Sequence, residues 1–385
     1  MTRVLLTHAQ LFDPEARAPR TGALLVEGGR IAGRPGPEEV AGIDAERIDL
    51  GGAGLAPGLL DLHFHGALPF AQGRDATACL MRASDSLVRH GTTAFLATTV
   101  ALPGPGLEAL LEALVPAVGT GAWSGAQPIG IHLEGPWIAP GAAGAQPPGA
   151  IRPVDPKEVD RVIARAAGTI RMVTLAPEVS GARELLAALS KARIVPALGH
   201  SLATPREIAE AIDAGLCHVT HLFNAMGPLH HRDLGVAGVA LTDDRLSCDL
   251  ICDGVHVHPS MVRLAAKAKG ERLMLITDQI DPPTPSGSFG SGELRDDGTA
   301  LWLPNGRLAG SRLFLDRALA NARQFGALSL HEAVAAATLR PARLLGVEAE
   351  RGTLRVGARA DFCVLGPDAR VLETWIEGVC VFAVA

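Results

Sequence analysis

The chain has 385 residues, of which 48% are hydrophobic and 20% are charged, and its formal net charge at pH 7 is -6. Acidic and basic residues are interleaved without a basic run, so the composition argues against a nucleic-acid partner and favours a small ligand. No apolar run reaches the roughly 18 residues of a membrane span, and the first residues lack the long apolar region of a signal peptide, so we expect a cytoplasmic protein without membrane contact.

Short segments typical of β-strands occur at both ends of the chain. They are residues 4–6, 23–26, 361–365 and 373–382. Neither end is long enough to bury a sheet face alone, so we expect the two ends to combine in one small β-sandwich domain. The expected boundaries are residues 1–50 plus 347–385 for this domain and 51–346 for a separate catalytic barrel.

Between these ends, apolar segments typical of strands alternate with amphipathic segments typical of helices. The eight strand candidates are residues 55–63, 93–98, 129–134, 172–176, 194–199, 218–223, 249–253 and 273–277. Two helices have clear start signals, at Thr204 and Ser329, each followed three residues later by glutamate. The alternation predicts an α/β fold with a parallel sheet. Eight strands predict a (β/α)8 barrel of the TIM type, with its active site at the carboxyl ends of the strands.

Ionisable residues stand at the ends of five of these strand candidates. They are His63 and His65 on the first, Glu134 on the third, His200 on the fifth, His221 on the sixth and Asp278 on the eighth. Residues two apart on a strand project to the same side, so both histidines of the first strand can face one point. Buried imidazoles and carboxylates that converge must be neutralised, paired or bound to a metal. Four histidines and two acids suit Zn²⁺, Fe²⁺ or another first-row divalent ion.

Each of these residues also has an ordinary structural interpretation. A lone carboxylate such as Glu134 can cap a helix or form half of an ion pair, and a His-x-His motif can be a surface polar pair. The hypothesis of a metal site therefore depends on all six residues lying at equivalent strand ends. Other histidines fall outside the pattern, and we interpret them as surface or packing residues: His8, His90, His218 and His331.

Several segments together resemble the metal-dependent amidohydrolase superfamily and, within it, the N-acetylglucosamine-6-phosphate deacetylases. They extend over nearly the whole chain and comprise residues 56–66, 132–136, 199–201, 220–226, 252–256 and 309–311. The His-x-His motif belongs to the whole superfamily, whereas the joint pattern is specific. The resemblance implies a barrel of the amidohydrolase kind.

The resemblance also implies roles for the residues at the strand ends. Glu134, His200 and His221 would be the principal metal ligands, and His63 and His65 would complete a second metal position. One or two divalent ions are implied, with zinc as the first expectation and iron, cobalt or manganese as alternatives. Such an ion lowers the pKa of a bound water and polarises the acetamide carbonyl. Asp278 would then act as the general acid and base.

The family's substrate contacts correspond to less distinctive residues. Those to the phosphate map onto Asn224, Ala225, His256 and Arg232, and the arginine would come from a neighbouring subunit, which implies a homodimer. The other substrate positions are Ala145, Gln146, Leu313, Phe314 and Leu315. Without the resemblance, Arg232 is better interpreted as a solvated charge in a loop.

Three departures from the family pattern concern specificity. Gln146 stands where the family usually has a histidine, and an amide can donate a hydrogen bond but cannot carry charge. Gln279 and the proline-rich residues 281–285 follow Asp278 where the family usually has small residues. Residues 312–315 are bulkier and more apolar than the corresponding family segment. The specificity can therefore differ while the hydrolytic centre is retained.

We therefore expect a metal-dependent amidohydrolase that removes the acetyl group from an N-acetylhexosamine 6-phosphate, principally N-acetylglucosamine 6-phosphate, in amino-sugar catabolism. One alternative is an enzyme of the same fold that acts on a different N-acyl or cyclic amide, such as N-acetylgalactosamine 6-phosphate. Another is a catalytically silent barrel that serves as a scaffold, although such a protein would not need Asp278 or the full set of ligands.

Overall fold

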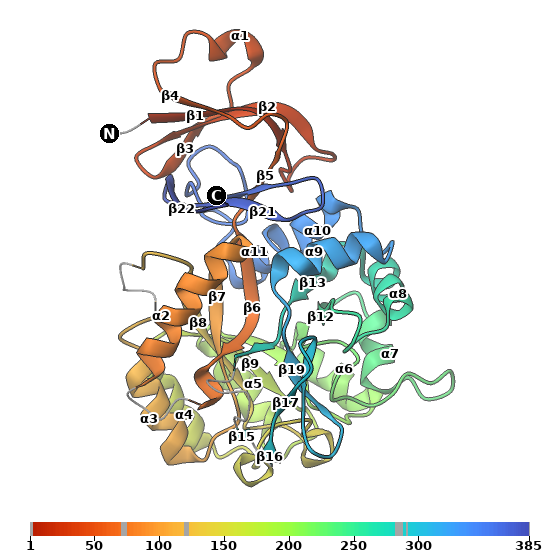
Figure 1. The fold of residues 1–385 in the computed structure, drawn as a ribbon. Helices are drawn as coiled ribbons and strands as arrows, with labels where there is room; N and C mark the ends of the chain where they lie inside the picture. Colours follow the sequence, from red (N-terminus) through yellow and green to blue (C-terminus); the bar gives the residue numbers. More distant parts are fainter. Residues whose placement is uncertain (1–2, 71–74, 119–122, 282–287, 290–291, 385) are drawn as a thin grey trace.

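The computed structural model describes residues 3–70, 75–118, 123–281, 288–289 and 292–384. A small β-region formed by both ends of the chain lies at one end of the molecule, and a larger α/β barrel occupies the rest (Figure 1). No helix among these residues is long and apolar enough to cross a lipid bilayer.

The small region is one eight-stranded sheet that contains both ends of the chain. Its strands are β1 (Arg3–Leu11), β2 (Arg20–Glu27), β3 (Arg30–Gly33), β4 (Glu46–Asp49), β5 (Gly54–Pro57), β20 (Phe362–Leu365), β21 (Val371–Ile376) and β22 (Val379–Ala383), and the short helix α1 (Pro37–Val40) precedes β4. The order is β22-β21-β20-β5-β1-β2-β3, with β4 paired to β1. Strand β5 joins the two ends, because it is parallel to β1 and antiparallel to β20.

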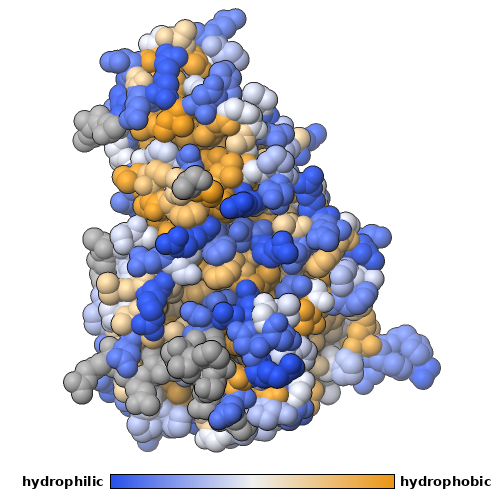
Figure 2. All heavy atoms as spheres, viewed as in Figure 1, coloured by the Kyte–Doolittle hydropathy of each residue, from blue (hydrophilic) through white to orange (hydrophobic). Residues whose placement is uncertain are grey.

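The core of this sheet is built from both ends of the chain. Leu6, Leu24 and Leu55 share one buried cluster with Phe362 and Trp375. The rings of Phe362 and Trp375 stack with their centroids 5.4 Å apart. The expected combination of the two ends is therefore confirmed. Figure 2 shows hydrophobic side chains gathered over this region.

The barrel strands follow one another in sequence order and pair in parallel. They are β6 (Leu59–Gly66), β7 (Thr92–Thr99), β8 (Gln127–Glu134), β9 (Ile170–Leu175), β10 (Val195–Leu198), β11 (His218–Val219), β12 (Ser247–Ile251) and β13 (Leu273–Ile276). The helices are α2 (Ala76–Leu87), α3 (Gly104–Leu114), α4 (Pro156–Ala166), α5 (Ala182–Lys191), α6 (Pro205–Asp213), α7 (Gly235–Thr242), α8 (Pro259–Lys269), α9 (Leu315–Gln324), α10 (Leu330–Ala336) and α11 (Leu339–Leu345). Single 3₁₀ turns lie at Leu68–Phe70, Val88–His90, Pro140–Ala142, Pro148–Ala150 and Gly270–Arg272. The predicted α/β barrel is confirmed.

A short extension follows the eighth barrel strand. Strand β14 (Gln279–Ile280) pairs with β6 and with β19 (Leu308–Ser311). Strands β17 (Arg295–Asp296), β18 (Ala300–Trp302) and β19 continue the sheet in antiparallel fashion, and β15 (Ser288–Phe289) pairs with β16 (Gly292–Glu293) as a separate hairpin. The extension brings residues around position 307 to the mouth of the barrel.

The first strand candidate, residues 55–63, is wrong as a single strand. Strand β5 ends at Pro57 in the small sheet, and β6 begins at Leu59 in the barrel. Gly58 lies between them, where a Cβ atom would stand 2.1 Å from Thr93 Oγ1. The apolar pattern continues across this point, so hydrophobicity alone gave no sign that the chain passes from one sheet to the other.

Candidate active site

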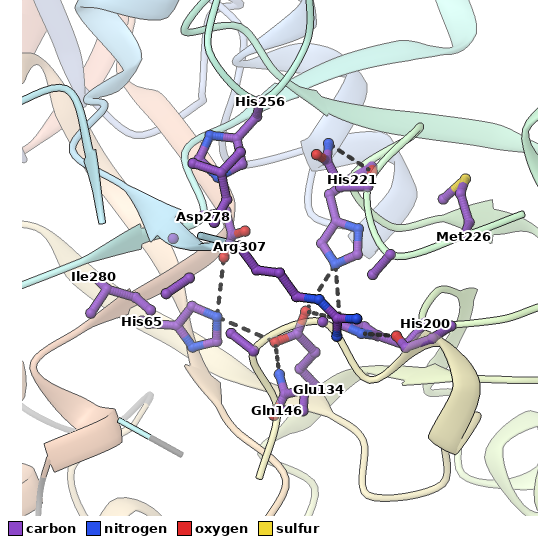
Figure 3. Close-up of a pocket in the computed structure, with 18 of the residues that line it drawn as sticks. His65, Glu134, Gln146, His200, His221, Met226, His256, Asp278, Ile280 and Arg307 are labelled. Carbon is purple, nitrogen blue, oxygen red and sulfur yellow. Dashed lines mark hydrogen bonds and ion pairs between the residues drawn. The ribbon is translucent and has the colours of Figure 1, made fainter. Parts of the chain in front are cut away.

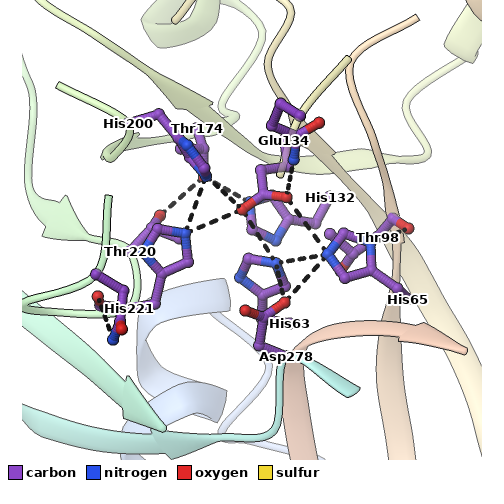
Figure 4. Close-up of polar contacts among 12 residues, drawn as sticks. His63, His65, Thr98, His132, Glu134, Thr174, His200, Thr220, His221 and Asp278 are labelled. Atoms are coloured by element: carbon purple, nitrogen blue, oxygen red, sulfur yellow. Dashed lines mark hydrogen bonds and ion pairs between the residues drawn. The ribbon is translucent and has the colours of Figure 1, made fainter. Parts of the chain in front are cut away.

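Two pairs of histidines face one glutamate at the carboxyl ends of the barrel strands (Figure 4). Glu134 Oε1 lies 3.1 Å from His200 Nε2, 3.0 Å from His221 Nε2 and 3.4 Å from His63 Nε2. Its second oxygen, Oε2, lies 3.3 Å from His65 Nε2. All five side chains are buried. The structure thus brings together the five residues that the sequence suggested as metal ligands.

Asp278 lies beside the first histidine pair. Its Oδ1 atom is 3.4 Å from His63 Nε2 and 3.2 Å from His65 Nε2. At 15%, the exposed fraction of its side chain is larger than the 3% of Glu134, and it lines the open pocket. Asp278 N donates a hydrogen bond to His63 O, and Ser311 N donates one to Asp278 O, both at 2.9 Å. The aspartate is therefore fixed to the strands on either side of it.

The turns that follow three barrel strands aim their side chains into the barrel. His200, His221 and Asp278 have φ values of 50°, 34° and 50°, a left-handed conformation that non-glycine residues adopt at a cost. Each of these residues is the second residue after the end of its strand, which is β10, β11 or β13. The barrel framework holds the strained turns, so the positions of their side chains are defined before any ligand arrives.

Backbone carbonyl groups fix the ring orientation of two histidines. Nδ1 of His65 lies 3.1 Å from Thr98 O, and Nδ1 of His200 lies 3.0 Å from Ala142 O. A carbonyl oxygen only accepts hydrogen bonds, so each Nδ1 carries the proton that it donates. In the neutral ring Nε2 then presents its lone pair to the centre of the cluster, as a metal ligand requires.

A buried histidine–aspartate contact that we did not predict supports His221. Asp249 accepts a hydrogen bond from His221 N through Oδ1, and its Oδ2 lies 2.9 Å from His218 Nε2. Nδ1 of His218 lies 2.7 Å from Ser247 Oγ. His218 and Asp249 are both fully buried, so His218 is a packing residue that also makes polar contacts, and not a surface residue. The signal in the sequence was an acid inside an otherwise apolar strand segment.

A second buried acid, Asp61, joins the first and last barrel strands. Its Oδ2 accepts a hydrogen bond from Thr277 Oγ1 at 2.6 Å, and its Oδ1 accepts from His63 N at 3.2 Å and from Thr277 N at 3.3 Å. Burial raises the pKa of Asp61 to about 7, although these hydrogen bonds oppose the shift. Asp61 thus holds the backbone of His63 next to Thr277, the residue before Asp278.

The charges of the cluster depend on one another. Burial by itself would lower the pKa of His65, but the carboxylates of Asp278 and Glu134 outweigh it and raise that pKa to about 10. Likewise, Glu134 overcomes the burial of His221 and raises its pKa to about 9. Burial would raise the pKa of both acids, yet the neighbouring histidines hold the pKa of Glu134 well below its usual value and lower that of Asp278. Both carboxylates are therefore ionised and attract positive charge.

The donor set fits one or two divalent ions. Two groups of buried ligand atoms share Glu134, one with His63 and His65 and the other with His200 and His221, and the atoms of each group lie within 4.8 Å of one another. Imidazole nitrogen and carboxylate oxygen are the ligands that zinc and other first-row divalent ions prefer. His132 is close but uses both ring nitrogens, at 3.2 Å from Leu62 O and 2.7 Å from Thr174 Oγ1.

The cluster opens into a cavity of about 370 Å³ (Figure 3). Five of the residues expected to contact substrate line it: Ala145, Gln146, Asn224, Ala225 and His256. The Nδ1 atom of His256 lies 2.6 Å from Asp253 Oδ2, which leaves Nε2 free to serve the cavity. Arg307 also lines the cavity, a residue that the sequence analysis did not select.

Both polar atoms of the Gln146 side chain form hydrogen bonds. Its Oε1 accepts a hydrogen bond from Ala101 N at 2.7 Å, and its Nε2 donates one to Glu134 Oε2. The residue is 5% exposed. Gln146 therefore lies under the glutamate and supports it, in addition to lining the cavity.

The remaining expected substrate residues do not line the cavity in this chain. Arg232 is in an exposed loop, where its Nη1 atom lies 2.8 Å from His231 Nε2. Leu313 and Leu315 pack in the barrel core, because the chain turns there from β19 into α9. Phe314 stacks on His90 with a centroid distance of 3.7 Å.

The altered segment after Asp278 is described only in part. Gln279 is 4% exposed and faces a second hollow on the other side of β6, which Phe64 and Phe314 also line. Residues 282–285 of the proline-rich stretch lie outside the described residues. Gln279 therefore does not form the wall of the cavity that contains the cluster.

A parallel α/β barrel whose carboxyl-end pocket contains a glutamate between two histidine pairs, with an aspartate beside them, defines a barrel hydrolase with a site suited to divalent metal. Residues 55–381 match the model of the Amidohydrolase family. The chain belongs to this family.

Three similar proteins show how close the relationship is. The chain is 35% identical over 379 residues to the N-acetylgalactosamine-6-phosphate deacetylase of Escherichia coli O157:H7, covering 98% of this chain and 97% of that protein. It is 37% identical over 395 residues to the N-acetylglucosamine-6-phosphate deacetylase of Bos taurus, covering 96% and 94%. A mutant N-acetyl-D-glucosamine-6-phosphate deacetylase from Mycobacterium smegmatis, solved in complex with N-acetyl-D-glucosamine-6-phosphate, superposes with a TM-score of 0.86 at 33% identity, covering 99% of this chain and 100% of that one.

Proposed function

We propose that this enzyme hydrolyses the acetamide of an N-acetylhexosamine 6-phosphate, principally N-acetylglucosamine 6-phosphate, and releases acetate and the amino-sugar phosphate. The observation that carries the proposal is Glu134 between two histidine pairs with Asp278 3.2 Å from His65 Nε2, at the floor of an open cavity. The relatives and the solved complex that bear the names of such deacetylases support this substrate class. A phosphorylated sugar does not cross a bilayer unaided, so we place the reaction, a step of amino-sugar catabolism, in the cytoplasm.

Glu134, His200 and His221 are the proposed ligands of the principal metal ion, with His63 and His65 completing a second position that shares the glutamate. Zinc is the first candidate, and iron, cobalt and manganese fit the same donors. When bound, such an ion polarises the acetamide carbonyl and lowers the pKa of water. The carbonyl groups of Thr98 and Ala142 keep two of these rings in the ligating orientation.

Asp278 is the proposed general base and acid. Its ionised carboxylate takes a proton from the attacking water while the new C–O bond forms. It then returns that proton to the amino-group nitrogen as the C–N bond breaks, so the base is restored when acetate and amine leave. The left-handed turn after β13 and the hydrogen bonds to His63 O and Ser311 N keep the carboxylate at this position during both transfers.

Substrate recognition is proposed to involve both the cavity and a second subunit. The phosphate would contact the side-chain amide of Asn224, a backbone group of Ala225 and the imidazole of His256. Asp253 holds this imidazole in place. Arg232 would complete this site from the neighbouring subunit of a homodimer. Leu229 and Leu234 flank its loop with exposed fractions of 42% and 39%, which favours contact with another surface.

The test is an acetate-release assay on purified protein loaded with divalent metal. We expect turnover of N-acetylglucosamine 6-phosphate, and we expect Asp278→Asn to retain the metal while losing about 100- to 10,000-fold in kcat. A folded, metal-loaded protein that released no acetate from any N-acetyl amino-sugar phosphate would refute the proposal. Full activity in Asp278→Asn would remove this residue from its role.

A second candidate is the same reaction on N-acetylgalactosamine 6-phosphate. It is favoured by the 35% identity to a deacetylase that bears that name and by Gln146, which supports Glu134 where a histidine was expected to reach the substrate. The two epimers differ at one hydroxyl group, so the ratio of their kcat/KM values decides between them. Phosphate-free N-acyl compounds and cyclic amides belong in the same panel. The complete cluster gives no support to a catalytically silent scaffold.

A further inference from the structure

Arg307 reaches into the cavity from the hairpin between β18 and β19. Its backbone is fixed at the base of this hairpin, because Leu303 N donates a hydrogen bond to Arg307 O at 2.8 Å and Arg307 N donates one to Asn305 Oδ1 at 3.1 Å. Figure 3 shows the side chain extending across the cavity in front of Glu134. The guanidinium group is thus presented to whatever occupies the cavity.

No acidic side chain of this chain neutralises that guanidinium. Among the described residues, no carboxylate oxygen lies within 4.0 Å of it, whereas the nearby Arg312 pairs with Asp281 at 3.2 Å and with Asp296 at 3.5 Å. The parts of the chain that the structure leaves undescribed contain no aspartate or glutamate. An arginine at a cavity wall that has no acidic partner can bind an anionic ligand.

The charge balance of the cavity points to the same conclusion. Arg307 is the one arginine or lysine among the described residues that line it. The two carboxylates there, Glu134 and Asp278, already face the histidine pairs, and together they would balance one divalent ion. With the principal ion alone in place, the arginine is the surplus positive charge, and an ion in the second position would add to this surplus. A phosphate monoester, which carries nearly two negative charges at neutral pH, balances it.

We propose that Arg307 binds the phosphate group of the substrate from within the same chain, and that it makes the enzyme prefer phosphorylated to neutral amino sugars. This inference rests on the proposed function. It differs from the role of Arg232, which would act from a partner subunit. A guanidinium group forms two parallel hydrogen bonds to phosphate oxygens, so the contact both attracts and orients the substrate.

The first experiment compares phosphorylated and neutral substrates. We expect Arg307→Gln to raise the KM for N-acetylglucosamine 6-phosphate about 10- to 100-fold with little change in kcat, because a charge-assisted hydrogen bond is lost. The ratio of kcat/KM for N-acetylglucosamine 6-phosphate to that for N-acetylglucosamine should fall in Arg307→Gln, and the ratio for Arg307→Lys should lie between those of the wild type and Arg307→Gln. The control is Arg295→Gln on β17 of the same extension, since Arg295 lies over the ring of Trp302, outside the cavity. An unchanged KM in Arg307→Gln, or a loss confined to kcat, would overturn the assignment.

A binding measurement separates this inference from the proposed function. The dissociation constant of glucosamine 6-phosphate for the metal-loaded protein, measured by calorimetry, should rise about 10- to 100-fold in Arg307→Gln and stay constant in Arg295→Gln. If the wild-type protein deacetylated no sugar phosphate but this shift occurred, the proposed function would fail and the anion site would stand. Binding that is equal in the wild type and in Arg307→Gln would overturn the anion site, whatever the activity.

Discussion

Gln146 has a role that its position in the family pattern did not indicate. The Ala101 N–H occupies its Oε1, so the other end must be the amide nitrogen, which donates to Glu134 Oε2. That oxygen also faces His65. Gln146 therefore limits the rotation of the carboxylate that both proposed metal positions share. The family histidine was expected to contact the substrate, whereas this glutamine positions a proposed ligand.

Removing the amide should weaken metal binding. Gln146→Leu keeps the size of the side chain but leaves Glu134 free to rotate, and loss of such a supporting contact typically lowers metal affinity about 10- to 100-fold. The measurement is a chelator competition for the bound metal ion. Gln324→Leu, at the exposed end of α9, is the control and should leave the affinity unchanged. Equal affinity in both variants would show that the hydrogen bond to Glu134 has no such role.

The histidine cluster predicts how the protein responds to pH. Burial opposes the protonation of His65 and His221, but in the absence of metal the neighbouring acids raise the pKa of His65 to about 10 and of His221 to about 9, so both rings are imidazolium cations at neutral pH. These raised values stabilise the folded state at low pH, and the stabilisation is lost as the pH rises through 9 to 10. A metal ion displaces the same protons, so its uptake at neutral pH should release about one or two of them.

Two measurements check this dependence. The melting temperature of chelator-treated protein should fall between pH 7 and pH 10, and metal should restore it over that range. Calorimetric titration with metal in buffers of different ionisation enthalpy gives the number of protons released. A melting temperature independent of pH together with no proton release would contradict the charges assigned to the cluster.

At the scale of elements, the strand ends were predictable and the turns after them were not. Apolar runs that stop at Glu134 and Asp278 located the rim, because the chain must leave the sheet where its apolar residues end. The left-handed backbone at His200, His221 and Asp278 had no sequence signal, since such turns normally contain glycine. Strand β11 is also only two residues long, because the chain already turns at His221.

The passage from β5 to β6 gives a prediction about one glycine. A Cβ atom on Gly58 would lie 2.1 Å from Thr93 Oγ1 and 2.8 Å from Thr93 Cβ, so a rotation of the threonine cannot relieve the clash. Gly58→Ala should therefore destabilise the protein by about 1–3 kcal/mol, the usual effect of overpacking. Denaturant unfolding measures the change. Gly149→Ala is the matched control, because a Cβ there meets nothing within 4 Å, and equal stability of the two variants would contradict the close approach.

At the scale of the whole molecule, the pairing of strands from distant parts of the chain was only partly predictable from the sequence. Each end of the chain was too short to form a sheet alone, so their combination could be inferred from residues 1–50 and 347–385. The β17–β19 extension escaped prediction because its strands have two to four residues and no long apolar run. Arg307 was consequently not selected from the sequence, since only the folded hairpin brings it to the cavity.

The proposed dimer can be tested by exchanging subunits between two defective variants. Arg232→Gln keeps Asp278 but cannot donate its arginine, and Asp278→Asn lacks the base but can still donate Arg232. If Arg232 acts across the interface, mixed dimers contain one complete site, and random exchange should restore about a quarter of the wild-type activity. The protein itself should have about twice the chain mass of 39.9 kDa by light scattering.

The same exchange distinguishes the two arginines. At a substrate concentration well below the wild-type KM, a mixture of Arg307→Gln with Asp278→Asn should show no more activity than its Arg307→Gln subunits give alone, because Arg307 is proposed to serve the cavity of its own chain, and the subunit that retains Asp278 still lacks this arginine. Recovery with Arg307→Gln would place that residue across the interface. No recovery with Arg232→Gln, in a mixture shown to contain mixed dimers, would confine each site to a single subunit and leave Arg307 as the arginine available to the phosphate.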